Sequence, residues 1–311
     1  MNYLVFGGAG FIGSYLIPKL LESGNTIFSI DSNKEYASRL EIHKRLRHGS
    51  FDVNDLDLLE KFISEDEHID GIIHLAANSD ISKSFSDPQI DLQDTLQTTI
   101  SALNFMKKRK IKYIFFSSSS AIYGDMGFDL SISEDTGPLI PISHYGACKL
   151  ASEALIHSYC SSYGFNSTIF RFPNVIGPSM THGVIYDFIQ KLKNTPNSLE
   201  VLGNGRQEKS YLHLSDLSRA IMFHIKNAQT KETFADIYNI GNKDTISVAE
   251  IAEIVRDMVS PKASISYQKE DRGWVGDVPR FKFNIDKIIA AGWQPRLSSR
   301  DAVIQAIKSS I

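Results

Sequence analysis

The chain has 311 residues, 42% of them apolar and 22% charged, enough to bury a large core and more than one domain usually holds. A net charge of -3 and a pI near 6.3 leave no basic surface for nucleic acid or an anionic membrane. Cys148 and Cys160 are too few for a disulfide framework or a typical metal site, and we expect no bound metal. Neither a basic leader nor an apolar run of membrane-spanning length is present, so the expected location is the cytoplasm.

Short apolar runs alternate with amphipathic segments through the first half of the chain. Buried strands are predicted for residues 3–6, 26–30, 71–75, 113–116 and 168–172. Helices are predicted for residues 12–23, 56–63, 90–106 and 147–163, with Gly24 and Gly164 as C-caps. This alternation predicts an α/β fold with a doubly wound parallel sheet.

Beyond Phe172 the rhythm is broken by glycines and prolines, which indicates a second, smaller α/β lobe. The breaks are Pro173, Gly177, Pro178, Pro196, Gly203 and Gly205. We expect a first domain over residues 1–173 with a returning segment at about 212–243, and a second lobe over 174–211 and 244–311.

The first predicted strand ends in Gly7-Gly8-Ala9-Gly10-Phe11-Ile12-Gly13, directly before a predicted helix. Glycines at this place let the backbone approach a pyrophosphate, and the helix N-terminus supplies amide donors. The alternative is an ordinary tight turn between strand and helix. The context favours a Rossmann-type dinucleotide site, with the expected contacts at Gly7, Gly10, Phe11, Ile12 and Gly13.

Acidic and small residues follow the next strands. Asp31 closes the second strand. A carboxylate at this place accepts hydrogen bonds from both hydroxyls of the adenosine ribose and would repel a 2′-phosphate, which favours NAD as the cofactor. Lys34 and Arg39 could pair with a 2′-phosphate, so NADP is the alternative. Asp52, followed by Val53, is expected either to accept from the adenine amino group or to cap a helix. After the fourth strand, His74 is expected to be packed rather than catalytic, and small side chains would let the dinucleotide pass close at Leu75, Ala76 and Ala77.

Tyr145 and Lys149 lie four positions apart in a predicted helix, downstream of the serine run 117–120. At that spacing an ammonium lies beside a phenol whose free pKa is about 10, and a positive charge favours the phenolate. Tyr145 is therefore a candidate general base near neutral pH. By itself the pair also suits two ordinary surface neighbours.

Together these motifs resemble the extended short-chain dehydrogenase/reductases that act on nucleotide sugars, the NAD-dependent epimerase/dehydratase family. The second half carries further landmarks of that family, in Arg171-Phe172-Pro173-Asn174, Val201-Leu202-Gly203-Asn204-Gly205, Tyr211 to Asp216, Tyr238 to Gly241, and Arg272 with Gly276-Asp277. The resemblance runs from end to end and is closest to UDP-glucose 4-epimerase-like enzymes.

The resemblance implies roles for individual residues. Lys149 would hold the nicotinamide ribose and lower the pKa of Tyr145, with Ser119 at the reacting hydroxyl and Ser118 as a neighbouring helper. Phe172 would lie at the cofactor. The substrate's nucleotide diphosphate would be held by Asn174, Lys209, Arg272 and Asp277. Lys209 stands where the family more often has arginine, which weakens that assignment.

One absent residue bears on the reaction. Dehydratases of this family carry an acidic residue just before the apolar-Tyr-Gly landmark, whereas this chain has Ala121 before Ile122-Tyr123-Gly124. Without that acid, elimination is disfavoured. The expected activity is NAD-dependent epimerisation at C4 of a nucleotide hexose, of the UDP-glucose/UDP-galactose type. A nucleotide 4-ketosugar reductase is the alternative among enzymes, and a non-catalytic dinucleotide sensor is disfavoured by the retained Ser119, Tyr145 and Lys149.

Two further expectations concern specificity and assembly. Phe281 falls near a position where a bulky aromatic disfavours N-acetylated sugars, but a core aromatic is equally compatible with the sequence. Two predicted helices carry stripes, at Leu92, Leu96, Thr99, Leu103 and Met106, and at Leu150, Ala154, His157 and Ser161. Such stripes usually pack on the sheet, and the resemblance implies that the other faces of these helices pair two copies into a homodimer.

Overall fold

The computed structural model describes residues 1–78, 80, 85–127, 130–228, 235–270, 278 and 280–311. The chain forms two compact units. The first comprises residues 1–119, 143–171 and 221–238, and the second comprises 120–142, 172–220 and 239–311. None of the described helices is long and apolar enough to cross a membrane.

The first unit is built on a seven-stranded sheet with the order β12-β7-β5-β4-β1-β2-β3. Its strands are β1 (Asn2–Phe6), β2 (Thr26–Asp31), β3 (Leu46–Ser50), β4 (Gly71–His74), β5 (Tyr113–Ser119), β7 (Asn166–Phe172) and β12 (Ala235–Asn239). From β3 to β5 the neighbouring strands run parallel, so Phe6, Asp31, His74 and Ser119 all end at one edge. The predicted α/β class and the five predicted strands are confirmed.

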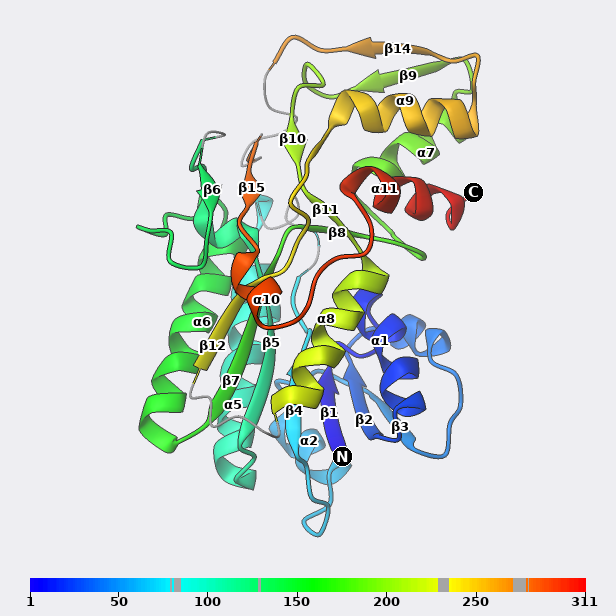
Figure 1. Cartoon of the computed structure of the whole chain (residues 1–311). Helices are drawn as coiled ribbons and strands as arrows, with labels where there is room; N and C mark the ends of the chain where they lie inside the picture. The colour runs from blue at the N-terminus through cyan, green and yellow to red at the C-terminus, as the bar shows by residue number, and fades with distance from the viewer. Residues whose placement is uncertain (79, 81–84, 128–129, 229–234, 271–277, 279) are drawn as a thin grey trace. The chain divides into compact units, whose positions relative to one another are not determined.

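Helical segments connect these strands. They are α1 (Phe11–Glu22), the 3₁₀ segment η1 (Lys34–Arg39), α2 (Leu56–Phe62), α4 (Gln89–Asp91), the π-helical segment η2 (Leu92–Gln97), α5 (Thr98–Arg109) and α6 (His144–Tyr163). A single core of interdigitated side chains joins α2, α5 and α6 to one face of the sheet, through Leu59, Leu103 and Ile156. Figure 1 shows α1 on the other face.

The predicted helix over residues 90–106 is confirmed, but it is not a regular α-helix throughout. It runs through α4, the π-helical segment η2 and α5, and the Thr98 and Thr99 hydroxyls donate to the Thr95 carbonyl, both at 3.0 Å, beside the π-helical segment. Hydrophobic spacing alone does not detect one extra residue in a helical turn. Of the predicted stripe here, Thr99, Leu103 and Met106 are fully buried, whereas Leu92 is 41% exposed.

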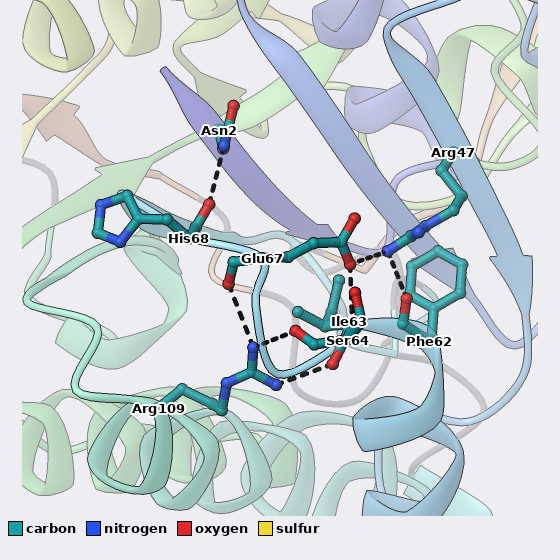
Figure 2. A network of polar contacts seen from close by, with 8 residues as sticks. All are labelled: Asn2, Arg47, Phe62, Ile63, Ser64, Glu67, His68 and Arg109. Carbon is teal, nitrogen blue, oxygen red and sulfur yellow. Dashed lines mark hydrogen bonds and ion pairs between the residues drawn. The ribbon is translucent and has the colours of Figure 1, made fainter.

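Arginines fasten the connection between α2 and β4, away from the edge where the strands end. Figure 2 shows Arg109, at the end of α5, donating to the carbonyl oxygens of Ile63 (2.8 Å), Ser64 (2.6 Å) and Glu67 (3.2 Å). Arg47 on β3 reaches the Phe62 carbonyl and the Glu67 carboxylate. The Phe62 and Ile63 carbonyls lie at the C-terminal end of α2, where backbone acceptors lack partners within the helix, and the other bonds hold the loop that follows.

The second unit consists of short strand pairs and helices around its own core. Its strands pair as β6 (Ser131–Ile132) with β15 (Lys282–Phe283), β8 (Asn174–Ile176) with β11 (Tyr211–His213), β9 (Ser198–Val201) with β14 (Ser264–Tyr267), and β10 (Glu208–Lys209) with β13 (Ile246–Ser247). Its helical segments are the 3₁₀ turn η3 (Ser120–Tyr123), α7 (Val184–Asn194), α9 (Val248–Val259), α10 (Asp286–Ala290) and α11 (Ser299–Lys308). The helix α8 (Leu214–Asn227) begins in this unit and ends in the first.

The observed grouping differs from the expected boundaries at three places. Residues 120–142 group with the second unit, residues 172–173 do so too, and the segment that returns to the first unit covers 221–238 instead of about 212–243. The reason for the first difference is local: β6 pairs with β15, and the Tyr123 hydroxyl donates to Asn239 at 2.7 Å.

Candidate active site

The glycine loop after β1 is tightly packed. Gly7 has a φ of +75°, and a Cβ on it would lie 2.8 Å from the Ala76 amide nitrogen, while a Cβ on Gly13 would lie 2.5 Å from the carbonyl oxygens of Gly7 and Gly8. Only glycine fits at these positions. Gly10 precedes α1, and no side chain caps that helix, so its first amides are not covered by a capping side chain. A tight loop before an open helix N-terminus suits a phosphate group.

Asp31 lies beside this loop at the end of β2. Its Oδ2 accepts from the Ala9 amide at 3.1 Å, its Oδ1 accepts from the Asn33 amide at 3.0 Å, and the side chain is buried. A carboxylate fixed next to the loop fits the adenosine ribose of a dinucleotide. Phe11 and Ile12 form the first turn of α1 and are half-buried.

The remaining residues predicted for the cofactor are placed as follows. Asp52 is exposed and accepts from the Asn54 amide at 2.9 Å, whereas the N-cap of α2 is Asp55, so the capping alternative for Asp52 is wrong. Val53 is buried. Leu75, Ala76 and Ala77 directly follow β4, and the first two contact the glycine loop through the backbone. The loop, the uncapped helix and Asp31 together fit NAD in this unit.

The structure brings Tyr145, Lys149 and Ser119 together at the strand ends. Ser143 caps α6 by accepting from the Gly146 amide at 3.1 Å, which starts the helix just before Tyr145. The Lys149 Nζ donates to the Ser117 carbonyl at 2.6 Å and lies 5.7 Å from the centre of the Tyr145 ring. The phenol of Tyr145 is hydrogen-bonded to the Ser119 side chain. A base candidate, a cation and a hydroxyl therefore share one site.

The electrostatics of this cluster differ from the expectation. Burial raises the pKa of Tyr145; the Ser119 hydrogen bond opposes this increase, and the negative charge of Asp91 adds to it. Burial lowers the pKa of Lys149 to about 7, against the opposing effects of Glu153, Asp91 and Cys148. The net shift of the Tyr145 pKa is thus upward, opposite in direction to the decrease expected from Lys149, because burial is the largest effect.

Ser118 does not join the cluster. It is fully buried, and its hydroxyl donates to the Glu153 carboxylate. Glu153 is also held by Arg171 on β7, whose Nε and Nη2 donate at 3.0 Å and 2.7 Å. This corrects the expected role of Ser118 as a direct helper: it fixes α6 to β5 and so positions Lys149 one turn earlier in the helix.

His74 is a buried neutral side chain. Its Nε2 pairs with the Thr99 hydroxyl at 3.1 Å, and burial followed by the charge of Lys149 lowers its pKa to about 3. Packing between Phe6 and Phe116 supports the expectation that it is structural. The two cysteines are buried free thiols.

Only some of the predicted substrate residues belong to the described part of the chain. Asn174 is exposed and opens β8, where it pairs with Tyr211, and Lys209 lies two positions before that tyrosine. These two candidates therefore lie near each other within the second unit. Arg272 and Asp277 lie outside the described residues.

Two aromatic residues of the predictions are also placed. Phe172 ends β7 and is buried. Phe281 is 5% exposed and packs edge-on against Phe283 at 5.3 Å, which supports the core alternative rather than a sugar contact.

Sequence reasoning missed three polar residues of the first unit: Asn78, Asp91 and Glu153. Asn78 donates to Asp91 at 2.9 Å, and both are buried. Glu153 had a detectable signal, since it lies four positions after Lys149 on the same helix. Asp91 had none, because its neighbours come from other parts of the chain.

Comparison with known proteins agrees with this geometry. A model of the NAD dependent epimerase/dehydratase family matches residues 3–241. The UDP-glucose 4-epimerase of Lactobacillus helveticus is 28% identical, with 94% of this chain and 96% of that protein covered. A crystal structure of a UDP-galactose 4-epimerase is 30% identical, with a TM-score of 0.86 over 100% of this chain and 98% of that one.

A further solved relative carries ligands. The UDP-glucuronic acid 4-epimerase of Bacillus cereus, in complex with UDP-glucuronic acid and NAD, is 25% identical, with a TM-score of 0.86 over 99% of this chain and 98% of that one. The chain belongs to the NAD-dependent epimerase/dehydratase family and is an NAD-dependent enzyme of its nucleotide-sugar epimerase group.

Proposed function

We propose that the enzyme inverts C4 of a nucleotide-linked hexose through a transient 4-keto sugar, with UDP-glucose and UDP-galactose as the leading pair. The observation that supports this most directly is the cluster of Tyr145, Ser119 and Lys149 in the unit that carries the glycine loop. Relatives that act on UDP-glucose, UDP-galactose and UDP-glucuronic acid support the substrate class. Ala121 argues against dehydration, because a methyl group cannot transfer a proton.

Each side chain has a defined task in this proposal. The Tyr145 oxygen takes the proton of the C4 hydroxyl and later returns it, while Ser119 hydrogen-bonds that same phenol. Lys149 supplies a positive charge that favours the phenolate. NAD, when bound, supplies the reversible hydride acceptor. Asn174 and Lys209 would hold the diphosphate, with Arg272 and Asp277 as further proposed contacts.

The charge of Lys149 gives the proposal a pH dependence. With a pKa of about 7, Lys149 is an ammonium below that pH and loses its charge above it, whereas the raised pKa of Tyr145 keeps the phenol protonated in the chain alone. Removal of the proton from the C4 hydroxyl by Tyr145 therefore requires additional positive charge near the phenol. The cationic nicotinamide of NAD fits that requirement chemically.

The reaction is tested with purified protein and a panel of UDP-, GDP-, dTDP- and CDP-sugars, including UDP-glucuronic acid, while proton NMR follows the C4 configuration. Interconversion without added NAD(H) identifies an epimerase. Turnover only when NAD(P)H is supplied and consumed would identify a 4-ketosugar reductase instead, and would overturn the proposal.

The role of Tyr145 is tested by replacing it with phenylalanine. Tyr145→Phe removes the proton acceptor and should lower turnover by about 10²–10⁴-fold while the substrate KM changes little. Tyr163→Phe is the matched control, because Tyr163 is an exposed phenol on the same helix. Full activity in Tyr145→Phe would exclude Tyr145 as the base.

We also propose that two copies pair through α5 and α6. These helices pack on each other, with the Tyr159 hydroxyl donating to Asn104 at 2.9 Å. The stripe on α6, which was expected to pack on the sheet, instead lies on the outer side: Ala154 and Ser161 are exposed, and Leu150 and His157 are half-buried. Leu92 adds an exposed apolar side chain at the start of η2. Such a face suits a second copy of the same helix pair.

A further inference from the structure

Asp91 is a buried carboxylate at the point where α4 meets η2. It is 0% exposed, and its Oδ1 accepts from the Asn78 Nδ2 at 2.9 Å. Its Oδ2 has no hydrogen-bond partner among the described residues. Asn78 is fixed in turn, because its amide donates to the Thr95 hydroxyl at 3.2 Å and its side chain donates to the Asp80 carbonyl at 3.0 Å. A carboxylate buried this completely needs a compensating positive charge.

Among the described residues of the first unit, two cations are buried, and they differ in how their charge is compensated. Arg171 is 3% exposed and forms a two-pronged ion pair with Glu153. Lys149 is 1% exposed, and its Nζ donates to a neutral group, the Ser117 carbonyl. Glu153 is therefore committed to Arg171 and Ser118. Asp91 is a further buried carboxylate of this unit, its Oδ2 has no ion-pair partner among the described residues, and α4 packs directly against the helix that carries Lys149.

We propose that Asp91 is the buried counter-charge of Lys149 and a positioning residue for the Tyr145–Lys149 pair, held in place by Asn78. Its carboxylate is fully buried. It acts through its charge on the two groups of that pair. For its effect on the reaction, this inference rests on the proposed function, whereas the charge pairing itself does not.

Electrostatics within the unit support this pairing. Burial lowers the pKa of Lys149, and the negative charge of Glu153 and, next in size, that of Asp91 oppose this decrease; the charge of Asp91 also raises the pKa of Tyr145. Three other titratable groups interact with Lys149: Glu153 and Cys148 on α6, and His74 on β4. Asp94 on η2 interacts with Asp91 and also with Asp52. At neutral pH the thiol of Cys148, whose pKa is raised, and the imidazole of His74, with a pKa of about 3, are uncharged.

The first test is the pH dependence of turnover in Asp91→Asn. Removing the carboxylate lowers the pKa of both Tyr145 and Lys149, so the rising and falling limbs of the kcat profile should both move to lower pH, by about one unit. Asp94→Asn is the matched control: it removes an exposed carboxylate three positions later, and its profile should stay at the wild-type position. A lower kcat with unmoved limbs would mean that Asp91 is merely structural, and would overturn the inference.

The second test needs no turnover. Thermal midpoints are compared for Asp91→Asn, Lys149→Met and the double variant. Each single change leaves one buried charge uncompensated, so the double variant should lose clearly less stability than the sum of the two. The pair Asp94→Asn and Lys149→Met should be additive.

The comparison of single and double variants decides the pairing even when a single variant does not fold. If Asp91→Asn alone does not fold, restoration of folding by Lys149→Met is the expected result. Additivity in the Asp91 cycle, or a double variant that stays unfolded, would overturn the counter-charge. Because the cycle measures stability, a protein that epimerises no sugar can still confirm the pairing, and an active epimerase can still refute it.

Discussion

Several side chains near the ends of the strands have pKa values that burial shifts away from the ordinary ones. His74 is the clearest example, because it is completely buried, is neutral at pH 7 and lies among Phe6 and Phe116. Its folded-state pKa of about 3 lies below the ordinary value of 6.5. Between these two values the unfolded chain binds a proton that the folded chain does not, so stability is complete above pH 6.5 and falls as the pH drops towards 3.

We therefore expect acid unfolding to be controlled in part by His74. A shift of this size corresponds to roughly 5 kcal/mol, a large share of a typical folding free energy. His74→Gln keeps a polar group for Thr99 without titrating, and should flatten the decline in unfolding free energy between pH 6.5 and 3, measured by urea denaturation. The control His144→Gln alters an exposed imidazole and should leave the slope as it is. An unchanged slope in His74→Gln would contradict the assignment.

The candidate site was partly predictable at this scale. Tyr145, Lys149 and Ser119 could be proposed together, because helical spacing and the serine run at a strand end are visible in the sequence. The pKa of Tyr145 could not be predicted, since it depends on how deeply the phenol is buried and on Asp91, which lies 54 positions earlier in the numbering. The hydrogen bond of Ser118 to Glu153 could not be predicted either, because it joins residues 35 positions apart in the sequence.

Among the helices, α5 and α6 end in the same left-handed conformation with different residues. α6 ends at Gly164 with a φ of 65°, which glycine adopts without strain, whereas α5 ends at Lys110 with a φ of 56°. For a side chain with a Cβ this conformation costs about 1 kcal/mol. Both positions are exposed, so packing does not compensate for the cost.

Lys110→Gly should therefore raise the unfolding free energy by up to about 1 kcal/mol, measured by urea denaturation. Gly164→Ala is the reciprocal change and should lower it by a similar amount. If Lys110→Gly destabilises the protein, the greater conformational entropy that glycine gives the unfolded chain outweighs the relief of strain.

For the whole molecule, the fold of the first unit was more predictable than that of the second. In the first unit, strands of four or more residues alternate with helices, so period and length are both visible for most of them. In the second unit, β6, β10, β13 and β15 each have two residues, too few to show an alternating pattern. Their pairing is set by tertiary contacts such as Asn239 with Ile132 at 3.0 Å.

Assembly is the property of the whole molecule that a solution measurement can decide. We expect light scattering to give about twice the mass of one chain, and Leu92→Lys to shift the protein towards the monomer by placing a charge in the apolar face. Ile42→Lys is the control, since Ile42 is fully exposed in a loop after η1. A monomeric mass for the unmodified protein would rule out the proposed pairing.

The π-helical segment η2 makes this region intolerant of a change in length. A π turn holds one residue more than an α turn, so deleting one residue between Leu92 and Gln97 would restore a regular helix and rotate one side of it against the other by about 100°. Asp91 lies before the segment and is tied to Asn78, while Thr99 lies after it and is tied to His74. Such a rotation would break at least one of these two hydrogen bonds. We therefore expect a homologue without this extra residue to lack either the bond between Asp91 and Asn78 or the bond between Thr99 and His74. Only homologues that keep the extra residue can hold both Asp91 and His74 as this chain does.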